Sequence, residues 1–375
     1  MSPVITAVEV LTVPVPFRRS FVIGSGPVGA GNAATEVVFV KLTADDGTVG
    51  WGEQRALPTW SYETHTTIAA VIEENLAPLV IGRSPYDIVG FHRAAAAALS
   101  PSVSNGFPFA RAAVDIALHD LAGKAAGLPV HALLGGRLTD RVPLCSAIGI
   151  QPVEQVEAQA VDSQDLHAYK VKISGDPVAD EAAIRAVARH SGTKPLWLDA
   201  NQSYRWSTLR RLLRAVEDVS TLSFVEQPVP STDWAGLQRI RSAAVLPVAI
   251  DEGSFTASDL ARTTMLGGID AVVVKVCKSG GLRQAQQSIA VAQAHGIEVL
   301  ASGLTDCGIG FAAALHLFSG ADLALPAELN GPELLAELYV DGLEFTDGCA
   351  VVPDRPGLGI DVDEDRLRAT AVHRS

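Results

Sequence analysis

The chain has 375 residues, a formal net charge of −13 at pH 7, 48% hydrophobic residues and 19% charged residues. This composition is globular, and the length suits two domains or one large α/β barrel with a smaller companion. The acidic balance and the lack of Lys/Arg runs argue against a nucleic-acid surface and against an anionic-membrane patch. An anionic ligand would therefore need a local cationic pocket.

Targeting signals are not expected. The first residues, "MSPVITAVEVLTVPV", have no basic segment and alternate like a strand, which argues against a signal peptide. No stretch reaches about 18 uninterrupted apolar residues, so no transmembrane span is expected. Four widely spaced cysteines without a C-x-x-C pair favour a reduced, cytoplasmic compartment. These are Cys145, Cys277, Cys307 and Cys349.

The first third of the chain is predicted to be strands followed by helices. Residues 3–15 and 35–52 are typical of strands, and the turn signal in "TADDGTVGWGE" predicts a hairpin. Apolar residues at helical spacing predict helices over residues 63–81, 85–99 and 107–126, the last ended by a glycine.

The pattern changes near residue 140, where short apolar runs begin to alternate with helical segments. There are eight such runs: "VPLCSAI", "AYKVKI", "PLWLDA", "LSFVEQP", "LPVAIDE", "AVVVKV", "IEVLAS" and "LALPAEL". This alternation predicts parallel β/α units and hence a (β/α) barrel. The last residues, from "LEFTDG" onward, are extended and turn-rich, and they are expected to pack back on the first lobe.

Charged residues stand at or near the carboxyl ends of five successive predicted strands. They are Lys172, Asp199, Glu226, Asp251 and Lys275, at intervals of 27, 27, 25 and 24 residues. A β/α unit has about this length, and the carboxyl ends of barrel strands meet at one mouth, where barrel active sites lie. Lys170 shares a strand face with Lys172, because residues two apart point the same way.

Three converging carboxylates repel one another unless a hard cation lies between them. Oxygen ligands favour Mg²⁺, with Mn²⁺ as a possible substitute. Lysines lie on either side of this triad in strand order. Near a metal, other ammonium groups and apolar walls, the pKa of a lysine should fall, which would make it a usable general base.

These residues resemble the enolase superfamily, and more narrowly its mandelate racemase/muconate lactonizing enzyme subgroup. The matching motifs are Lys170-x-Lys172, Asp199 in "LDAN", Glu226 in "VEQP", Asp251 in "AIDE" and Lys275 in "VKVCKSGG". The similarity spans the chain, from "DGTVGWGE" through "ARAAVDIALHDLAGKAAGLPVHALLGG" to "RPGLGIDVDEDRL".

The resemblance implies a (β/α)₇β barrel over residues 131–340 and an α+β capping domain over residues 1–130. Residues 341–375 would return to the capping domain. It also implies an enediolate, stabilised by Mg²⁺ and formed by proton removal next to a substrate carboxylate, or the reverse step. The expected partners are a small carboxylate substrate and further copies of the chain.

The resemblance also implies roles for the strand-end residues. Asp199, Glu226 and Asp251 would bind Mg²⁺, while Lys172 and Lys275 would act as acid and base on opposite faces of the substrate.

Three further residues receive supporting roles. Lys170 would assist beside the substrate carboxylate. Asn201 has the strand parity of Asp199 and would support the ligands or an oxyanion. Glu252 has the opposite parity to Asp251, so Asp251 is favoured as the ligand and Glu252 as its neighbour.

The eighth predicted strand bears on the reaction. The strand before it, the seventh, reads "IEVLASGLTD" and lacks the histidine that mandelate racemases carry after this strand. In the eighth strand, Glu328 in "PAELNGPELL" resembles an auxiliary acid of muconate cycloisomerases. Asn330 departs from that pattern and resembles a weakened form of the acidic D-x-D of dipeptide epimerases. Cycloisomerisation of a dicarboxylate such as cis,cis-muconate is favoured. The alternatives are a racemase or epimerase of dipeptides or N-acylamino acids, and an o-succinylbenzoate synthase.

Several other motifs are ambiguous. "GSGPVG", residues 24–29, matches a dinucleotide fingerprint, which leaves a nucleotide-dependent oxidoreductase as a remote alternative. A loop and a strand follow it instead of a helix, so it is expected to be a loop over the barrel mouth. "KSGG", residues 278–281, suits a phosphate cradle or a βα turn. Trp60 and Tyr62 are candidates to line the pocket. A non-catalytic binding barrel is the last alternative.

Overall fold

The computed structural model describes residues 2–100, 105–243 and 245–375. Its N-terminal part contains a four-stranded antiparallel sheet with the strand order β18-β1-β4-β5. The strands are β1 at Ile5–Pro16, β4 at Ala34–Ala44, β5 at Val49–Arg55 and β18 at His373–Arg374. The antiparallel pairing of β4 with β5 confirms the predicted hairpin.

The predicted helices of the first third are present. They are α1 (His65–Val71), the π-helical turn η1 (Ile72–Leu76), α2 (Ala77–Val80), α3 (Ile88–Ala98) and α5 (Pro108–Ala126). Helix α5 is buried on all sides and packs on β5. Gly52 permits this close packing, because a Cβ there would lie 1.9 Å from the carbonyl oxygen of Ala113. Among the described residues, no helix is both long and apolar enough to cross a membrane.

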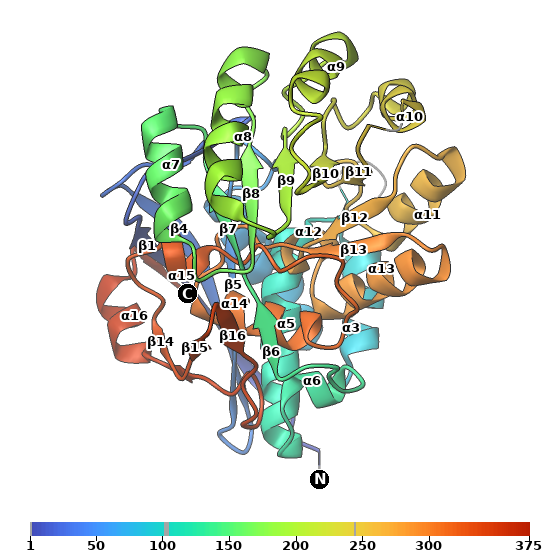
Figure 1. Cartoon of the computed structure of the whole chain (residues 1–375). Coiled ribbons are helices and arrows are strands. Elements are labelled where there is room, and N and C mark those ends of the chain that lie inside the picture. Colours follow the sequence, from blue (N-terminus) through green and yellow to red (C-terminus); the bar gives the residue numbers. More distant parts are fainter. Residues whose placement is uncertain (1, 101–104, 244) are drawn as a thin grey trace.

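Seven parallel strands form the curled sheet of the barrel, in chain order from β7 to β13. They are β7 (Cys145–Ile148), β8 (Ala168–Lys172), β9 (Leu196–Asp199), β10 (Leu222–Glu226), β11 (Val248–Ile250), β12 (Ala271–Val274) and β13 (Glu298–Ala301). Helices follow the strands and surround the sheet (Figure 1). They are α7 (Val153–Asp162), α8 (Pro177–Ser191), α9 (Trp206–Ala215), α10 (Trp234–Ser242), α11 (Ala257–Leu266), α13 (Leu282–Ala294) and α14 (Gly308–Phe318).

Two of the eight predicted barrel strands differ from expectation. The run "LALPAEL" contributes only two bridges, Leu144 with Ala327 and Ser302 with Glu328, which join β7 and β13 and close the barrel. The run "VPLCSAI" is divided, because β6 (Arg141–Pro143) pairs with β16 (Cys349–Val351) outside the barrel. Only β7 enters the ring. The result is a (β/α)₇β barrel with an α+β cap.

The last residues connect the barrel back to the N-terminal sheet. Their elements are short: α15 (Gly331–Leu334), β14 (Val340–Asp341), β15 (Phe345–Thr346), β17 (Asp361–Val362) and α16 (Glu364–Thr370). Strand β18 then pairs antiparallel with β1, Leu11 opposite Arg374, so the C-terminal tail completes the cap sheet at its edge. Figure 1 shows α16 on the side of the molecule where β1 and β4 lie, and α16 packs against β1.

The segment "GSGPVG" is not the loop that the sequence predicts. Strand β3 (Gly26–Gly29) pairs with β2 (Phe21–Ile23) to form a hairpin, and β4 follows it instead of a helix. The hairpin lies against the barrel, because the carbonyl of Val22 accepts the N–H of Ile150 at 2.9 Å. At Gly24 a Cβ would lie 2.2 Å from the carbonyl oxygen of Ala200, so only glycine permits this close contact.

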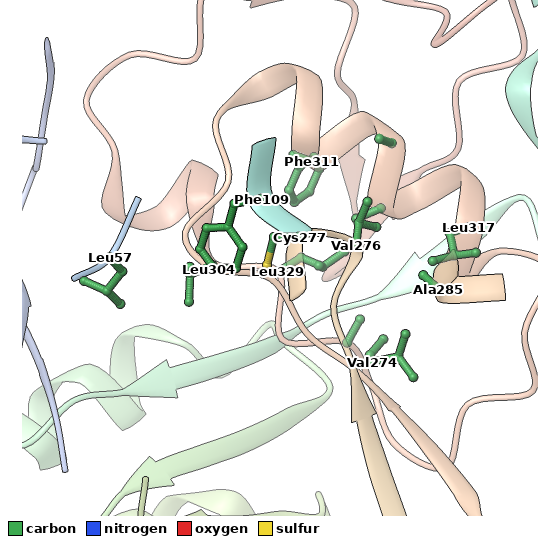
Figure 2. Packing of buried hydrophobic residues seen from close by; sticks show 14 of the residues in the cluster. Leu57, Phe109, Val274, Val276, Cys277, Ala285, Leu304, Phe311, Leu317 and Leu329 are labelled. Carbon is green, nitrogen blue, oxygen red and sulfur yellow. The ribbon is translucent and has the colours of Figure 1, made fainter. Parts of the chain in front are cut away.

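One buried apolar cluster joins the cap to the barrel. Figure 2 shows Phe109 of α5 beside Cys277, Leu304 and Leu329 of the barrel. Burial of such side chains contributes about 1.5–3 kcal/mol each. The shared core therefore holds the cap in place over the carboxyl ends of the barrel strands.

A buried carboxyl group also spans this junction. Glu53, on β5, accepts the backbone N–H of Ile309 in the first turn of α14 at 2.9 Å. Burial and the nearby Asp306 raise the pKa of Glu53 to about 8, despite the opposing effect of the helix N–H groups. Glu53 is therefore mostly protonated at neutral pH.

The Glu53→Gln variant should change the pH dependence of stability. The folded pKa, about 8, is raised above the ordinary value of 4.5. The protonated form thus stabilises the fold below pH 4.5. This contribution to the free energy of unfolding is lost progressively as the pH rises from 4.5 through 8, by at most about 1.4 kcal/mol per pH unit. Between pH 6 and pH 8, urea unfolding should show the free energy of unfolding of Glu53→Gln rising relative to that of the native chain. The control Glu74→Gln, at an exposed site, should show no such change. The same pH dependence in Glu53→Gln and the native chain would contradict the raised pKa of Glu53.

Candidate active site

The strand-end residues lie side by side at one mouth of the barrel. Lys172, Asp199 and Glu226 are the last residues of β8, β9 and β10, and they are direct neighbours in the strand register. Asp251 and Lys275 come one residue after β11 and β12. All five are buried. The 24–27-residue spacing therefore places them in one cluster.

Lys170 forms the centre of the cluster. Its Nζ lies 2.7 Å from Oε2 of Glu328, 2.9 Å from Oε1 of Glu226 and 3.1 Å from Oδ2 of Asp199. Burial alone would lower the pKa of Lys170, but the neighbouring carboxylates, Asp199 first, raise it well above its usual value. Lys170 is fully buried, so its ammonium group is a fixed positive charge below the mouth.

The other two lysines of the sequence prediction each contact one carboxylate closely. Nζ of Lys172 lies 2.6 Å from Oδ2 of Asp199 and 3.2 Å from Oε1 of Glu328. Nζ of Lys275 lies 2.6 Å from Oδ2 of Asp251 and 4.4 Å above the ring of Trp60. The two lysines lie on opposite sides of the barrel, because β8 and β12 are its second and sixth strands.

A fourth lysine belongs to the cluster and was missed in the sequence. Lys278, in the short helix α12 (Val276–Ser279), donates to the carbonyl oxygen and to Oδ1 of Asp251, both at 2.7 Å. The signal was its position three residues after Lys275, since residues i and i+3 share a helix face. "KSGG" is thus a βα turn whose lysine folds back into the site.

The pKa values of the buried lysines shift in different directions. Burial lowers the pKa of Lys278, and the charge of Asp251 only partly offsets this. For Lys275, burial acts in the same direction, but Asp251 overcomes it and raises the pKa. The fall in lysine pKa predicted from the sequence assumes a metal ion beside the lysines, and it stays a prediction.

The carboxylates are affected unequally. Burial and the adjacent negative charge of Asp199 raise the pKa of Glu226 well above its usual range. Burial alone would also raise the pKa of Asp251, but Lys275 and Lys278 lower it to about 2. Glu226 and Asp199 therefore form a crowded pair in which one more positive charge would be stabilising.

Asn201 and Glu252 lie next to the ligands predicted from the sequence. The backbone N–H of Asn201 donates to Oδ1 of Asp199 at 3.0 Å, and its side-chain amide donates to Oε1 of Glu252 at 3.1 Å. Trp60 donates its ring N–H to the same oxygen at 3.1 Å. The second oxygen of Glu252 and the amide oxygen of Asn201 are buried without a hydrogen-bond partner.

The chemistry of these groups fits a hard divalent cation. Three buried carboxylates and two buried oxygens without partners provide the oxygen donors that Mg²⁺ prefers. Within residues 2–100, 105–243 and 245–375, no three acidic, His or Cys side chains are already arranged around one ion position. Lysine ammonium groups contact Asp199, Glu226 and Asp251 instead. An ion would therefore compete with ammonium groups for the same oxygens.

A small cavity of about 20 Å³ lies above the charged cluster. Its upper wall is apolar and comes from the cap: Phe21, Ile23, Val28, Leu57 and Trp60. Its floor is polar and comes from the barrel: Lys172, Asn201, Lys275, Thr305, Glu328 and Asn330. Trp60 thus lines the pocket as the sequence suggested, whereas Tyr62 is not part of the wall and is 47% exposed. The hairpin β2–β3 covers the mouth.

Fold and site together define a barrel enzyme of the enolase type. The model of the enolase C-terminal domain-like family matches residues 153–366. The model of the mandelate racemase/muconate lactonizing enzyme N-terminal domain matches residues 6–135. The chain belongs to the enolase superfamily, in the subgroup of mandelate racemases and muconate lactonizing enzymes, and it is an isomerase-type enzyme of that superfamily.

Known members of this subgroup are similar along nearly their whole length. Muconate cycloisomerase 1 of Rhodococcus opacus is 30% identical over 349 residues, which are 89% of this chain and 91% of that protein. The structure of N-succinyl Arg/Lys racemase from Bacillus cereus superposes with a TM-score of 0.91 at 27% identity, covering 100% and 99% of the two chains. The dipeptide epimerase of Enterococcus faecalis, complexed with Mg and a dipeptide, has a TM-score of 0.87 at 27% identity, covering 96% and 100%.

The Lys278→Met variant should be strongly destabilised. Removing this ammonium group leaves Oδ1 of Asp251 buried without its partner, and breaking a buried ion pair costs about 3–5 kcal/mol. Urea unfolding without added metal measures the change in the free energy of unfolding. The control Lys194→Met removes a lysine that is not buried and should change it by less than about 1 kcal/mol. Equal effects of the two variants would show that Lys278 carries no structural charge pair.

Proposed function

We propose that the chain is a Mg²⁺-dependent cycloisomerase of a dicarboxylate such as cis,cis-muconate. One observation carries the proposal. Lys172 and Lys275 reach the same cavity from opposite sides of the barrel, each held at 2.6 Å by a carboxylate of the charged cluster. A proton donor or acceptor would thus lie on either face of a bound carboxylic acid, within reach of the carbon next to its carboxylate.

Asp199, Glu226 and Asp251 would hold the metal. When bound, Mg²⁺ supplies Lewis-acid stabilisation of the negative charge that develops on the substrate carboxylate, and Mn²⁺ is a possible substitute. The oxygen donors of the site support this assignment, as does the bound Mg of the epimerase from Enterococcus faecalis. Asn201 and Glu252 would orient the ligands through their contacts with Asp199 and with each other.

Lys172 is the proposed acid in lactone formation. One carboxylate oxygen adds to the double bond of the other half of the substrate. The π electron pair of that double bond moves to the carbon next to the second carboxylate. This carbon then takes a proton from the Lys172 ammonium. The reverse reaction returns this proton to Lys172. Glu328 orients Lys172 through its contact of 3.2 Å, while Lys170 and Lys275 provide positive charge for the anionic substrate.

The cavity wall favours a substrate without a free ammonium group. Glu328 is the acidic residue of the wall, and both its oxygens already contact lysines. Asn330, two residues further, is uncharged. An amino-terminal ammonium group of a dipeptide would therefore find no available carboxylate among the described wall residues, whereas a dicarboxylate meets Lys172 and Lys275.

A racemase of N-acylamino acids is the second candidate, and one observation favours it. The side-chain oxygen of Asn330 is buried in the wall without a hydrogen-bond partner, and it could accept an acyl amide N–H. In such a racemase both Lys172 and Lys275 would transfer protons. A synthase of o-succinylbenzoate would use the same lysines without this amide contact.

We place the enzyme in the cytoplasm as a homo-oligomer. All four cysteines are free, which suits a reducing compartment. Large apolar side chains such as Met265, 87% exposed, and Leu138, 74% exposed, are available for contacts between copies.

Metal removal should abolish turnover, and Mg²⁺ should restore it. A concentration of Mg²⁺ one hundred times its Kd should also stabilise the protein by about 2.7 kcal/mol, since it binds the folded state. Glu226→Gln should keep the fold, because it relieves the repulsion with Asp199, and should lose most of the Mg²⁺-dependent stabilisation in thermal unfolding. Full activity of the metal-free protein would refute the metal assignment.

Deuterium incorporation should identify the substrate class. In D₂O, ¹H NMR should show exchange at the carbon next to the carboxylate of muconolactone, but not of dipeptides or N-succinyl amino acids. Lys172→Ala should reduce this exchange by at least about 100-fold, because it removes the proton-transfer group.

Lys275→Ala is the matched variant in this assay. It should retain measurable exchange with muconolactone, since lactone chemistry needs one acid, but would abolish racemisation, which needs two. Exchange only with N-succinyl amino acids, with racemisation lost in both variants, would establish the racemase instead.

A further inference from the structure

A buried cation outside the catalytic cluster joins the cap, the hairpin and the barrel. Arg55, the last residue of β5, is 1% exposed. Its Nη2 donates to the carbonyl oxygen of Val28 in the hairpin at 2.6 Å. Its Nη1 donates to the carbonyl oxygen of Leu304, in the barrel loop after β13, at 3.2 Å. Val28 and Leu304 are both part of the cavity wall.

The guanidinium group is anchored from the cap side. Nε donates to the hydroxyl of Thr35 on β4 at 3.2 Å, and the group lies 5.2 Å from the ring centre of Phe17. The same ring lies against the hairpin, since a Cβ at Gly29 would be 2.5 Å from it. Arg55 is therefore held in place by residues that belong neither to the hairpin nor to the barrel.

Arg55 makes no ion pair within 4.0 Å to any residue described in the structure. Burial lowers the pKa of Arg55 to about 10, and the charge of Asp306 opposes this shift. Burying a charge in this way is unfavourable unless its hydrogen bonds are strong. The guanidinium group therefore depends on its charge-assisted bonds to the two wall carbonyls, which join the hairpin to the barrel through one side chain.

The hairpin must move for a substrate to enter. A cavity of about 20 Å³ holds on the order of one water molecule, and any carboxylic acid substrate is several times larger. The hairpin contacts the barrel through Val22 and Ile150 and through the close approach of Gly24. Of the hairpin contacts named here, the bond from Arg55 to Val28 is the one with a charged donor. This bond breaks when the hairpin opens.

We propose that Arg55 is a positioning residue that latches the β2–β3 hairpin closed over the barrel mouth by bonding the Val28 and Leu304 carbonyls at once. The latch sets the equilibrium between the closed and open hairpin and so the affinity for substrate. The inference depends on the proposed function only for the choice of substrate in the kinetic assay.

Amide hydrogen exchange of the Mg²⁺-loaded, substrate-free enzyme tests the latch directly. Opening of the hairpin limits exchange of its amides. Loss of a hydrogen bond from a charged group should speed exchange over residues 21–29 about 10- to 100-fold in Arg55→Ala. Exchange in strands β9–β11 should stay unchanged, which shows that the barrel remains folded. Thr35→Val, which removes an anchoring bond but neither wall bond, should have a much smaller effect.

Chemical rescue and kinetics separate a latch from a general loss of packing. Guanidinium chloride at a non-denaturing concentration should slow hairpin exchange in Arg55→Ala, whereas sodium chloride at the same concentration should not. With muconate as substrate, KM should rise by a factor similar to the change in exchange, with kcat much less affected. Arg55→Lys, which keeps the charge but not the paired donors, should fall between the native enzyme and Arg55→Ala.

Native-like hairpin exchange in Arg55→Ala, or exchange raised equally throughout the barrel, would overturn the latch. The exchange measurement needs no substrate. An enzyme that does not turn over muconate would therefore refute the proposed function and leave the latch standing. If Arg55→Ala does not fold, exchange in Arg55→Lys decides by the same criterion.

Discussion

Buried ammonium groups contact buried carboxylates at the carboxyl ends of the barrel strands, and the rest of the structure depends on their mutual neutralisation. Lys170 alone contacts three carboxylates within 3.1 Å. None of these groups is stable in an apolar interior without its partners. The barrel brings the partners together because parallel strands end at the same level, and the lysine–carboxylate pairs keep the site polar inside an otherwise apolar core.

The cap determines what this charged cluster can do. A barrel alone would expose the lysines to water, where a proton acceptor loses the low-dielectric surroundings that tune it. Trp60 covers Lys275 and donates a hydrogen bond to Glu252, so one residue of the cap contacts both the proposed acid/base and a neighbour of the proposed metal ligands. The hairpin and Arg55 close the remaining side. The cap therefore supplies the apolar wall above the charged cluster.

Local sequence patterns were sufficient for the residues at the strand ends. Lys172, Asp199 and Glu226 could be placed because strand parity and β/α spacing are short-range properties. Lys278 was missed because it lies in the short helix α12, where strand parity does not apply. Arg55 could not be placed, because its partners come from the hairpin and from the barrel loop after β13, which only the tertiary packing brings together. The eighth strand was overestimated for a related reason: "LALPAEL" has the composition of a strand, but two bridges are enough to close a ring whose other members already fix its curvature.

The position of a bound ion tests the central claim most directly. Crystals grown with Mn²⁺, a substitute that scatters X-rays anomalously, would locate the ion without reference to activity. We expect one anomalous peak at the barrel mouth, about 2.0–2.3 Å from oxygens of Asp199, Glu226 and Asp251, with the ammonium groups of Lys172 and Lys275 on either side. A protein that binds no ion there at saturating Mn²⁺, or an ion held by other residues, would contradict the claim that these carboxylates form a metal site between two proton-transfer lysines.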